Sequence, residues 1–219
     1  MNVTYNVDCM EAMKETEDQF YDLAIVDPIY GDVTKGGYMT NINSTSHNAR
    51  AIDYHTGIWN QEKTSQEYFK ELFRVSKNQV IWGGNYFIEE INRNSQGWIV
   101  WDKRHAEGTR YADCELAWTS FNRATRIFRF RWNGMLQEDM RHKEKRIHPT
   151  QKPVALYEWI LTNYAKEGDK ILDTHLGSGS SRIAAYNLGF DFTGYEIDSE
   201  YFRLQEQRFW NHTSQLRLF

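Results

Sequence analysis

Four short apolar segments, each ended abruptly by a carboxylate or by glycine, constrain the fold of this chain more than any other feature. They are residues 23–26, 79–82, 170–172 and 190–195, followed by Asp27, Gly83, Asp173 and Glu196. Apolar runs of this kind predict buried strands. In an open α/β sheet the carboxyl ends of parallel strands form the edge at which ligands bind. The chain therefore predicts such a sheet, with polar side chains gathered at one edge.

The segments between these strands carry apolar residues at helical spacing. Residues 3–26 predict a strand, a helix over 9–16 and a second strand, and this β-α-β unit indicates a parallel sheet. Further helices are expected at 65–76, 86–92, 153–164 and 199–210, and one more ends at Leu188. Another strand is expected at 98–101, and residues 116–118 and 127–132 look like a pair of strands joined by a turn around Asn122.

Composition fits one folded domain and excludes several classes of protein. The 219 residues are 15% aromatic, which is enough for a sizeable core. The net charge of −4 excludes a uniformly basic nucleic-acid binder, so any basic face must be local. Cys9 and Cys114 lie far apart, so we expect neither a disulfide framework nor a metal site. We find no signal peptide and no apolar run near the ~20 residues of a membrane helix, and we expect a cytoplasmic protein.

The tetrapeptide Asp27-Pro28-Ile29-Tyr30 follows the first of the four segments. Pro28 ends the strand, which leaves a carboxylate and an aromatic ring together at its carboxyl end. A carboxylate there can accept a hydrogen bond from an exocyclic amine, and the ring can stack on a flat base. A strand followed by a turn explains these four residues equally well.

A glycine-rich turn follows Asp173 and opens a helix. Strand, glycine turn and helix form a nucleotide-binding arrangement, in which Gly177 and Gly179 let the backbone approach a ligand. Glu196 lies about 20 residues further on, where an acid can bind both ribose hydroxyls. The dinucleotide version of the motif has a third glycine, and Arg182 stands in its place, which argues against an NAD site. A plain tight turn is the alternative.

Two segments are candidates for contact with DNA. Residues 122–146 contain eight Lys or Arg and three Asp or Glu, a local charge of +5 in an otherwise acidic chain, which suits a phosphate backbone. The candidate contacts within 122–147 are Arg123, Arg126, Arg141 and Arg146. Residues 31–63, rich in Gly, Asn, Ser and Thr, predict a loop insertion that is either a lid or a surface loop. A solvated charged loop also explains the basic segment.

Taken in order, these motifs resemble the amino-group DNA methyltransferases that use S-adenosylmethionine. The Asp-Pro-x-Tyr motif comes first, and the cofactor motif and ribose-binding acid come last. This permuted order is similar to the β group of the family, and especially to its short phage and prophage members. Residues 148–153 match the family's His-Pro-Thr-Gln-Lys-Pro box, and residues 97–103 and 115–118 look like family core segments.

The resemblance implies a three-layer Rossmann-like fold with a seven-stranded, mostly parallel sheet and helices on both faces. The whole chain, 1–219, would be one domain with the 31–63 insertion and a target-recognition segment at 122–147. It also implies roles for individual residues. The target-base site would be Asp27, Pro28 and Tyr30, and the cofactor site Asp8, Thr150, Lys152, Asp173, His175, Gly177, Gly179 and Glu196.

Within that cofactor site, Asp8 would lie near the adenine or the catalytic pocket, and Thr150 and Lys152 near the methionine end. Two positions depart from the family pattern. Ile29 replaces a second proline, and His175 replaces a phenylalanine expected beside the cofactor. We do not interpret His175 as a metal ligand, because no partner has a suitable spacing.

The function that this resemblance implies is methyl transfer from S-adenosylmethionine to adenine N6 in double-stranded DNA, on a base flipped out of the duplex. Three alternatives stay open: cytosine N4 methylation, a decayed DNA-binding protein of the same fold, and a nicotinamide-dependent oxidoreductase. The last explains neither the Asp27 tetrapeptide nor the basic segment. The sequence leaves open the recognition site, the presence of a cognate restriction enzyme and the formation of a homodimer.

Overall fold

The computed structural model describes residues 1–31, 63–104, 112–133 and 136–214, so most of the predicted 31–63 insertion lies outside the described residues. One large sheet has the strand order β1-β10-β9-β2-β3-β5-β4-β6. Its strands are β1 (Asn2–Tyr5), β2 (Tyr21–Val26), β3 (Ser76–Trp82), β4 (Trp98–Asp102), β5 (Cys114–Thr119), β6 (Arg126–Arg129), β9 (Lys170–Asp173) and β10 (Asp191–Tyr195). A separate antiparallel pair joins β7 (Trp132–Asn133) to β8 (Leu136–Gln137).

The sheet confirms the predicted architecture and holds one strand more than the seven we expected. Every pairing is parallel except those of β5, which runs antiparallel to both β3 and β4. The predicted pairing of 116–118 with 127–132 is wrong, because β4 lies between β5 and β6. Both edges of β5 are already bonded to β3 and β4, so the chain after β5 crosses to the free edge of β4.

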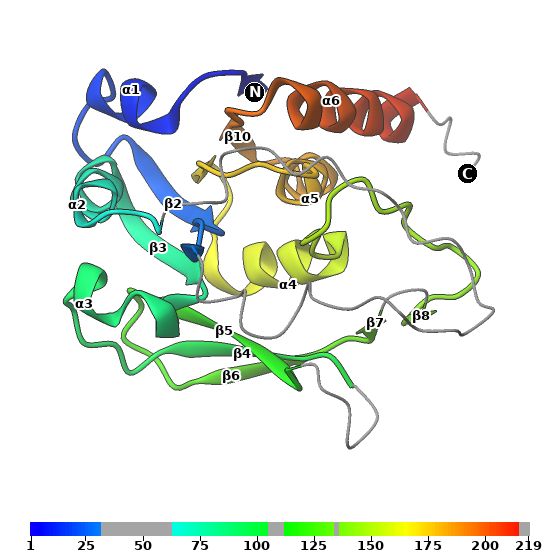
Figure 1. Cartoon of the computed structure of the whole chain (residues 1–219), viewed down its shortest axis with the longest axis horizontal. Helices are drawn as coiled ribbons and strands as arrows, with labels where there is room; N and C mark the ends of the chain where they lie inside the picture. The colour runs from blue at the N-terminus through cyan, green and yellow to red at the C-terminus, as the bar shows by residue number, and fades with distance from the viewer. Residues whose placement is uncertain (32–62, 105–111, 134–135, 215–219) are drawn as a thin grey trace.

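Helices cover both faces of this sheet, as Figure 1 shows. One face carries α1 (Cys9–Lys14), α2 (Gln66–Val75) and α3 (Ile88–Ile91), packed on the side chains of one apolar cluster. The other carries α4 (Val154–Tyr164) and α5 (Ser180–Leu188), packed on a second cluster. The last helix, α6 (Ser199–Ser214), lies beside α5. The three layers match the prediction.

Local chemistry sets several of these boundaries. The Asp8 carboxylate accepts a hydrogen bond of 2.8 Å from the Met10 amide and so caps α1. Pro153 immediately precedes α4, where its missing amide proton costs nothing. Gly189 ends α5 in the left-handed region, with φ of +75°. Within the described ranges, no helix has both the length and the apolar character to span a membrane.

Candidate active site at the carboxyl edge of the sheet

The parallel strands bring the predicted strand-end residues to one edge. Strands β2, β3, β9 and β10 run parallel to one another, so their carboxyl ends lie at the same edge of the sheet. The residues at or just after these ends are Asp27, Gly83, Asp173 and Glu196. Because β5 runs the other way, its second residue reaches this edge as well, and Glu115 pairs with Trp101 near the end of β4. The edge therefore holds four predicted positions and one that the sequence analysis did not select.

Each oxygen of the Asp27 carboxylate contacts another side chain. The Tyr30 hydroxyl donates to Oδ1, and the Lys152 ammonium lies against Oδ2. Lys152 Nζ also lies 3.3 Å from Glu115 Oε2, and the other oxygen of Glu115 pairs with Lys103. The four charged groups alternate in sign, from Lys103 through Glu115 and Lys152 to Asp27. This order lets each buried charge face an opposite one.

Burial and pairing oppose each other in this chain of charges. Burial alone would lower the pKa of Lys152, but the carboxylates of Asp27 and Glu115 more than offset it, and the pKa is raised. Burial alone would raise the pKa of Glu115, yet Lys152 and Lys103 bring it down to about 2. Burial and the Asp27 charge hold the pKa of Tyr30 well above its usual range. At neutral pH Lys152 and Glu115 are ionised, and Tyr30 is a neutral hydrogen-bond donor.

The Tyr30 ring lies where the backbone after β3 has no side chain. Gly83 has a φ of +64°, and a Cβ atom there would overlap the ring. Tyr86 packs against the ring with centroids 5.1 Å apart and planes tilted by 31°, and Phe87 lies 5.8 Å away, nearly edge-on. Tyr30 and the exposed Tyr86 ring thus stand together beside the Asp27 carboxylate. Flat rings in this position suit stacking on a base.

The glycine turn is organised around Glu196. The Gly177 amide donates to Glu196 Oε2 at 2.7 Å, and the Asp198 amide donates to Oε1 at 2.9 Å. Burial raises the pKa of Glu196. A carboxylate offers about four acceptor positions, so Glu196 can also accept a hydrogen bond from a hydroxyl group. Gly177 and Gly179 have φ of +51° and +71°, and a Cβ on Gly179 would lie 3.1 Å from Gln205. The turn and its acid fit a ligand that carries ribose hydroxyls.

Asp173 supports this turn from inside the protein. Its side chain is 2% exposed, and it accepts hydrogen bonds from Ser181 Oγ at 2.5 Å and from the His175 amide at 3.0 Å. Burial raises the pKa of Asp173 to about 7. Arg182, which replaces the third glycine of a dinucleotide motif, points into the protein and donates to Asn2 and Gln205 at 2.9 and 3.0 Å. It packs the first turn of α5 and leaves the turn's ligand side free.

His175 packs against an aromatic ring near the glycine turn. Its ring meets Tyr68 at 5.3 Å, close to edge-on, and its Nδ1 lies 2.9 Å from the Thr174 hydroxyl. Burial lowers the pKa of His175 to about 4, so the ring is neutral at pH 7. No group of three or more potential metal ligands gathers among the residues that the structure describes.

The remaining predicted cofactor residues occupy the rim of the site. Asp8 caps α1, which lies near the end of β1. Thr150 Oγ1 is 3.1 Å from Nδ1 of His148, and Gly177 lies beside the same ring. His148 is 8% exposed and packs on Tyr201 at 4.3 Å. Burial lowers the pKa of His148 to about 4. His148 thus connects the His-Pro-Thr-Gln-Lys-Pro box to the glycine turn.

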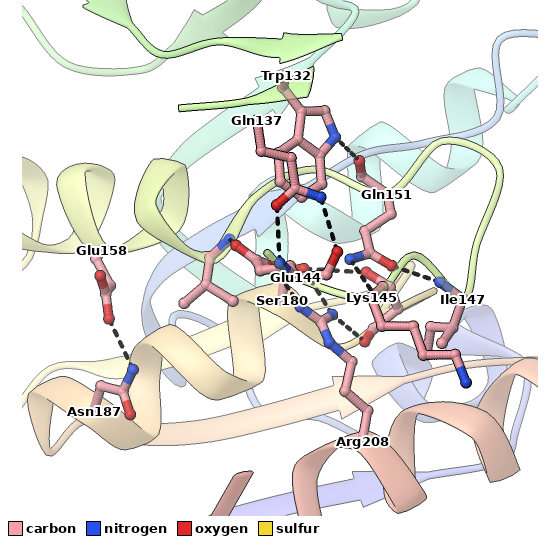
Figure 2. Close-up of polar contacts among 12 residues, drawn as sticks. Trp132, Gln137, Glu144, Lys145, Ile147, Gln151, Glu158, Ser180, Asn187 and Arg208 are labelled. Atoms are coloured by element: carbon pink, nitrogen blue, oxygen red, sulfur yellow. Dashed lines mark hydrogen bonds and ion pairs between the residues drawn. The ribbon is translucent and has the colours of Figure 1, made fainter. Parts of the chain in front are cut away.

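The four candidate arginines do not share one surface. Arg126 begins β6 and pairs with Ile99, at the amino edge of the sheet, opposite Asp27. Arg123 lies at the same edge, where it donates to the Asn163 carbonyl at 2.7 Å. Arg141 and Arg146 lie instead in the segment between β8 and α4. Glu144 of this segment contacts Arg208, which also bonds the glycine turn (Figure 2). The segment that holds the second pair is therefore linked to the candidate site.

The fold is an α/β sheet whose carboxyl edge holds the Asp27 carboxylate and a glycine turn bound to Glu196, an arrangement typical of nucleotide-binding enzymes. A family model described as DNA methylase, covering N6 and N4 methyltransferases, matches residues 81–207. The chain therefore belongs to this DNA methylase family, whose members use S-adenosylmethionine as methyl donor. The resemblance drawn from the sequence is confirmed.

Three relatives illustrate the likeness. The type II methyltransferase M.HinfI of Haemophilus influenzae is 26% identical over 244 residues, which is 95% of this chain and 68% of that protein. The crystal structure of M1.HpyAVI with S-adenosylmethionine superposes with a TM-score of 0.59 at 22% identity, covering 95% of this chain and all of that one. The cytosine-N4-specific PvuII DNA methyltransferase gives 0.60 at 13% identity, covering 94% and 85%. The two structures show a shared fold.

Proposed function

We propose that this chain transfers a methyl group from S-adenosylmethionine to the N6 amine of adenine in double-stranded DNA. The observation that carries the proposal is the position of Asp27 and Tyr30, side by side at the sheet edge that also holds the glycine turn and Glu196. An amine acceptor and a cofactor turn at one edge bring the two reactants together. Aspartate at position 27, where the cytosine-N4 enzymes of the resembled family carry serine, supports adenine.

Methyl transfer requires that the target amine be positioned in line with the methyl group more than that it be chemically activated. When bound, S-adenosylmethionine supplies an electrophilic methyl group on a positively charged sulfur. Asp27 and the Pro28 carbonyl accept the two hydrogens of the target amine, which directs the nitrogen lone pair towards the cofactor side. Tyr30 stacks on the flipped base, next to Tyr86. The carboxylate also stabilises the positive charge that the nitrogen gains before it loses its proton.

The target amine approaches an Asp27 carboxylate that two side chains already contact. Tyr30 contacts one of its oxygens and Lys152 the other, and each oxygen keeps an acceptor position for an amine hydrogen. Glu115 lies 3.3 Å from Lys152 and provides a second anion, on which the ammonium stays paired when Asp27 receives the amine. Tyr30 gives up its hydroxyl contact when its ring turns to a base. Glu115 and Lys103 therefore belong to the proposed site.

DNA is proposed to bind along the segment between β8 and α4. Each of its three acids has a partner in the protein: Glu138 pairs with Arg104, Asp139 accepts from the Arg141 amide, and Glu144 pairs with Arg208. Its cations Arg141, Lys143 and Lys145 are exposed. With the acids already paired, these exposed cations can contact phosphates. On this proposal the DNA lies near the glycine turn and Asp27.

A matched pair of variants tests the role of Asp27. Asp27→Ala should abolish transfer of radiolabelled methyl groups to unmethylated DNA, while S-adenosylhomocysteine still binds with near wild-type affinity in calorimetry. Asp22→Ala is the control, because it removes the same residue type from the other end of β2. Asp22 pairs with Lys77 at the opposite edge and should leave turnover intact. Full activity of Asp27→Ala would overturn the assignment.

A further inference from the structure

Arg208 of α6 holds two separate parts of the chain at once. Its Nη1 donates to the Ser178 carbonyl at 2.7 Å and to the Ser180 hydroxyl at 2.9 Å, and both serines belong to the glycine turn. Its Nη2 donates to Glu144 Oε2 at 2.6 Å. Figure 2 shows the guanidinium between Ser180 and Glu144. One side chain thus bridges the cofactor turn and the segment that we propose to face DNA.

Glu144 is in turn fixed by three more hydrogen bonds. Its Oε1 accepts from the Val154 amide, the first residue of α4, at 3.0 Å. The Glu144 amide donates to Gln137 Oε1 at 2.8 Å, and Gln137 Nε2 donates to the Glu144 carbonyl at 2.8 Å. Gln137 lies on β8, so the whole span from β8 to α4 is tied to this glutamate. The segment cannot shift as a body without disturbing the Arg208 contacts.

A second anchor leads to the other half of the site. The Trp132 indole donates to the Gln151 carbonyl at 2.7 Å, and Gln151 Oε1 accepts from the Ile147 amide at 2.9 Å (Figure 2). The next residue after Gln151 is Lys152, which pairs with Asp27. The segment is therefore connected to the glycine turn at one end and to the amine-accepting carboxylate at the other.

The burial and rigidity of the Arg208–Glu144 ion pair allow it to transmit a shift of the segment to the glycine turn. Both side chains are largely removed from solvent, with 14% and 24% of their surface exposed. A guanidinium is planar and rigid, so a displacement of Glu144 changes the direction in which Arg208 meets the two serines. A charge pair out of water tolerates separation poorly, because each partner would be left uncompensated. Ordering the segment and ordering the turn therefore favour each other.

We propose that Glu144 and Arg208 are positioning residues that couple DNA binding to cofactor binding. DNA that settles on residues 136–147 holds Glu144 in place, Glu144 orients Arg208, and Arg208 shapes the turn for the cofactor. By thermodynamic reciprocity the cofactor tightens DNA binding by the same factor. This inference rests on the proposed function, since it takes residues 136–147 as the surface that meets DNA.

Calorimetry with S-adenosylhomocysteine tests the coupling. Its Kd is measured for the purified full chain alone and with a duplex that carries the methylated site, identified by sequencing wild-type reaction products. The wild type should bind about 5–150-fold more tightly with the duplex. In Glu144→Gln the ratio between the two Kd values should fall close to one. The ratio should fall in Arg208→Lys as well, because an ammonium is a point charge that cannot replace a planar fork.

Two comparisons make the test decisive. Glu71→Gln is the matched control: Glu71 pairs with Arg74 at 2.8 Å within α2, which covers the opposite face of the sheet from α4 and α5. It should keep the wild-type factor. The double variant Glu144→Gln with Arg208→Lys should lose no more coupling than either single variant, because both act through one contact.

Several outcomes would overturn the inference. These are a wild-type protein whose Kd is the same with and without the duplex, a Glu144→Gln variant that keeps the full factor, and a Glu144→Gln loss of affinity that is equal in both conditions. The last would indicate a purely structural role. Failure of the proposed function gives a different result, because the reaction products of the wild type would then contain no N6-methyladenine.

Discussion

Lys152→Met tests whether the charged chain at Asp27 is as tightly coupled as its geometry indicates. Lys152 is 4% exposed and lies between two carboxylates, Asp27 and Glu115. Methionine keeps the length of the side chain and removes the charge. Asp27 then loses its ion pair, whereas Glu115 retains Lys103. Removing one partner of a buried pair costs about 3–5 kcal/mol, because the other charge is left uncompensated.

For a chain of this size, about 1 kcal/mol corresponds to a shift of about 2–4 °C in melting temperature. Lys152→Met should therefore melt about 6–20 °C below the wild type at pH 7 in thermal unfolding followed by circular dichroism. Lys77→Met is the matched control. Lys77 pairs with Asp22 while 51% exposed, and such surface pairs contribute about 0–1 kcal/mol. The control should stay within about 4 °C of the wild type.

A Lys152→Met protein that melts like Lys77→Met would refute the account of the paired carboxylates. It would mean that Lys152 contributes little to holding Asp27 in place.

Three further predictions concern the glycine beside Tyr30, the buried acid and the cofactor carboxylate. Gly83→Ala should lower turnover on unmethylated DNA at least about tenfold, because the added methyl group overlaps the Tyr30 ring. The control Gly168→Ala should keep wild-type turnover, because Gly168 also has a positive φ, of +87°, but an added Cβ there has no atom within 4 Å. Equal turnover of the two variants would refute the role of the Tyr30 ring. Burial raises the pKa of Asp173 from 3.8 to about 7, so the folded state keeps a proton that the unfolded state loses, and stability declines as pH rises between these values. The melting temperature of Asp173→Asn minus that of the wild type should therefore rise by about 3–5 °C per pH unit from pH 4 to 7. A difference that does not change with pH would contradict the raised pKa of Asp173. Glu196→Ala should weaken S-adenosylhomocysteine binding at least about tenfold in calorimetry, and an unchanged Kd would remove Glu196 from the cofactor site.

The strand-end residues could be predicted from sequence because their argument is local. Asp27, Asp173 and Glu196 each follow an apolar run, and parallel strands bring such positions to one edge whatever the order of the strands. The glycine turn was equally readable, since strand, glycines and helix follow one another within residues 170–188. Its positive φ angles at Gly177 and Gly179 agree with that prediction.

Positions that depend on strand direction could not be read in the same way. Glu115 reaches the site because β5 is antiparallel to its neighbours, and nothing in residues 114–119 encodes that direction. Arg126 is the first residue of β6, and β6 runs parallel to β4, so Arg126 lies at the amino edge of the sheet, opposite the site. The aromatic residues that follow Arg126, namely Phe128, Phe130 and Trp132, pack on the core, but they carry no information about the neighbouring strand.

Nucleoside analysis of the reaction product tests the central proposal most directly. The purified chain is incubated with unmethylated DNA and S-adenosylmethionine, and the DNA is digested and examined by mass spectrometry. N6-methyladenine is the expected product, and it should be absent with Asp27→Ala. N4-methylcytosine would keep the fold and the geometry of transfer but contradict the assigned base. Unmodified DNA from a protein that binds the cofactor would contradict methyl transfer to DNA itself.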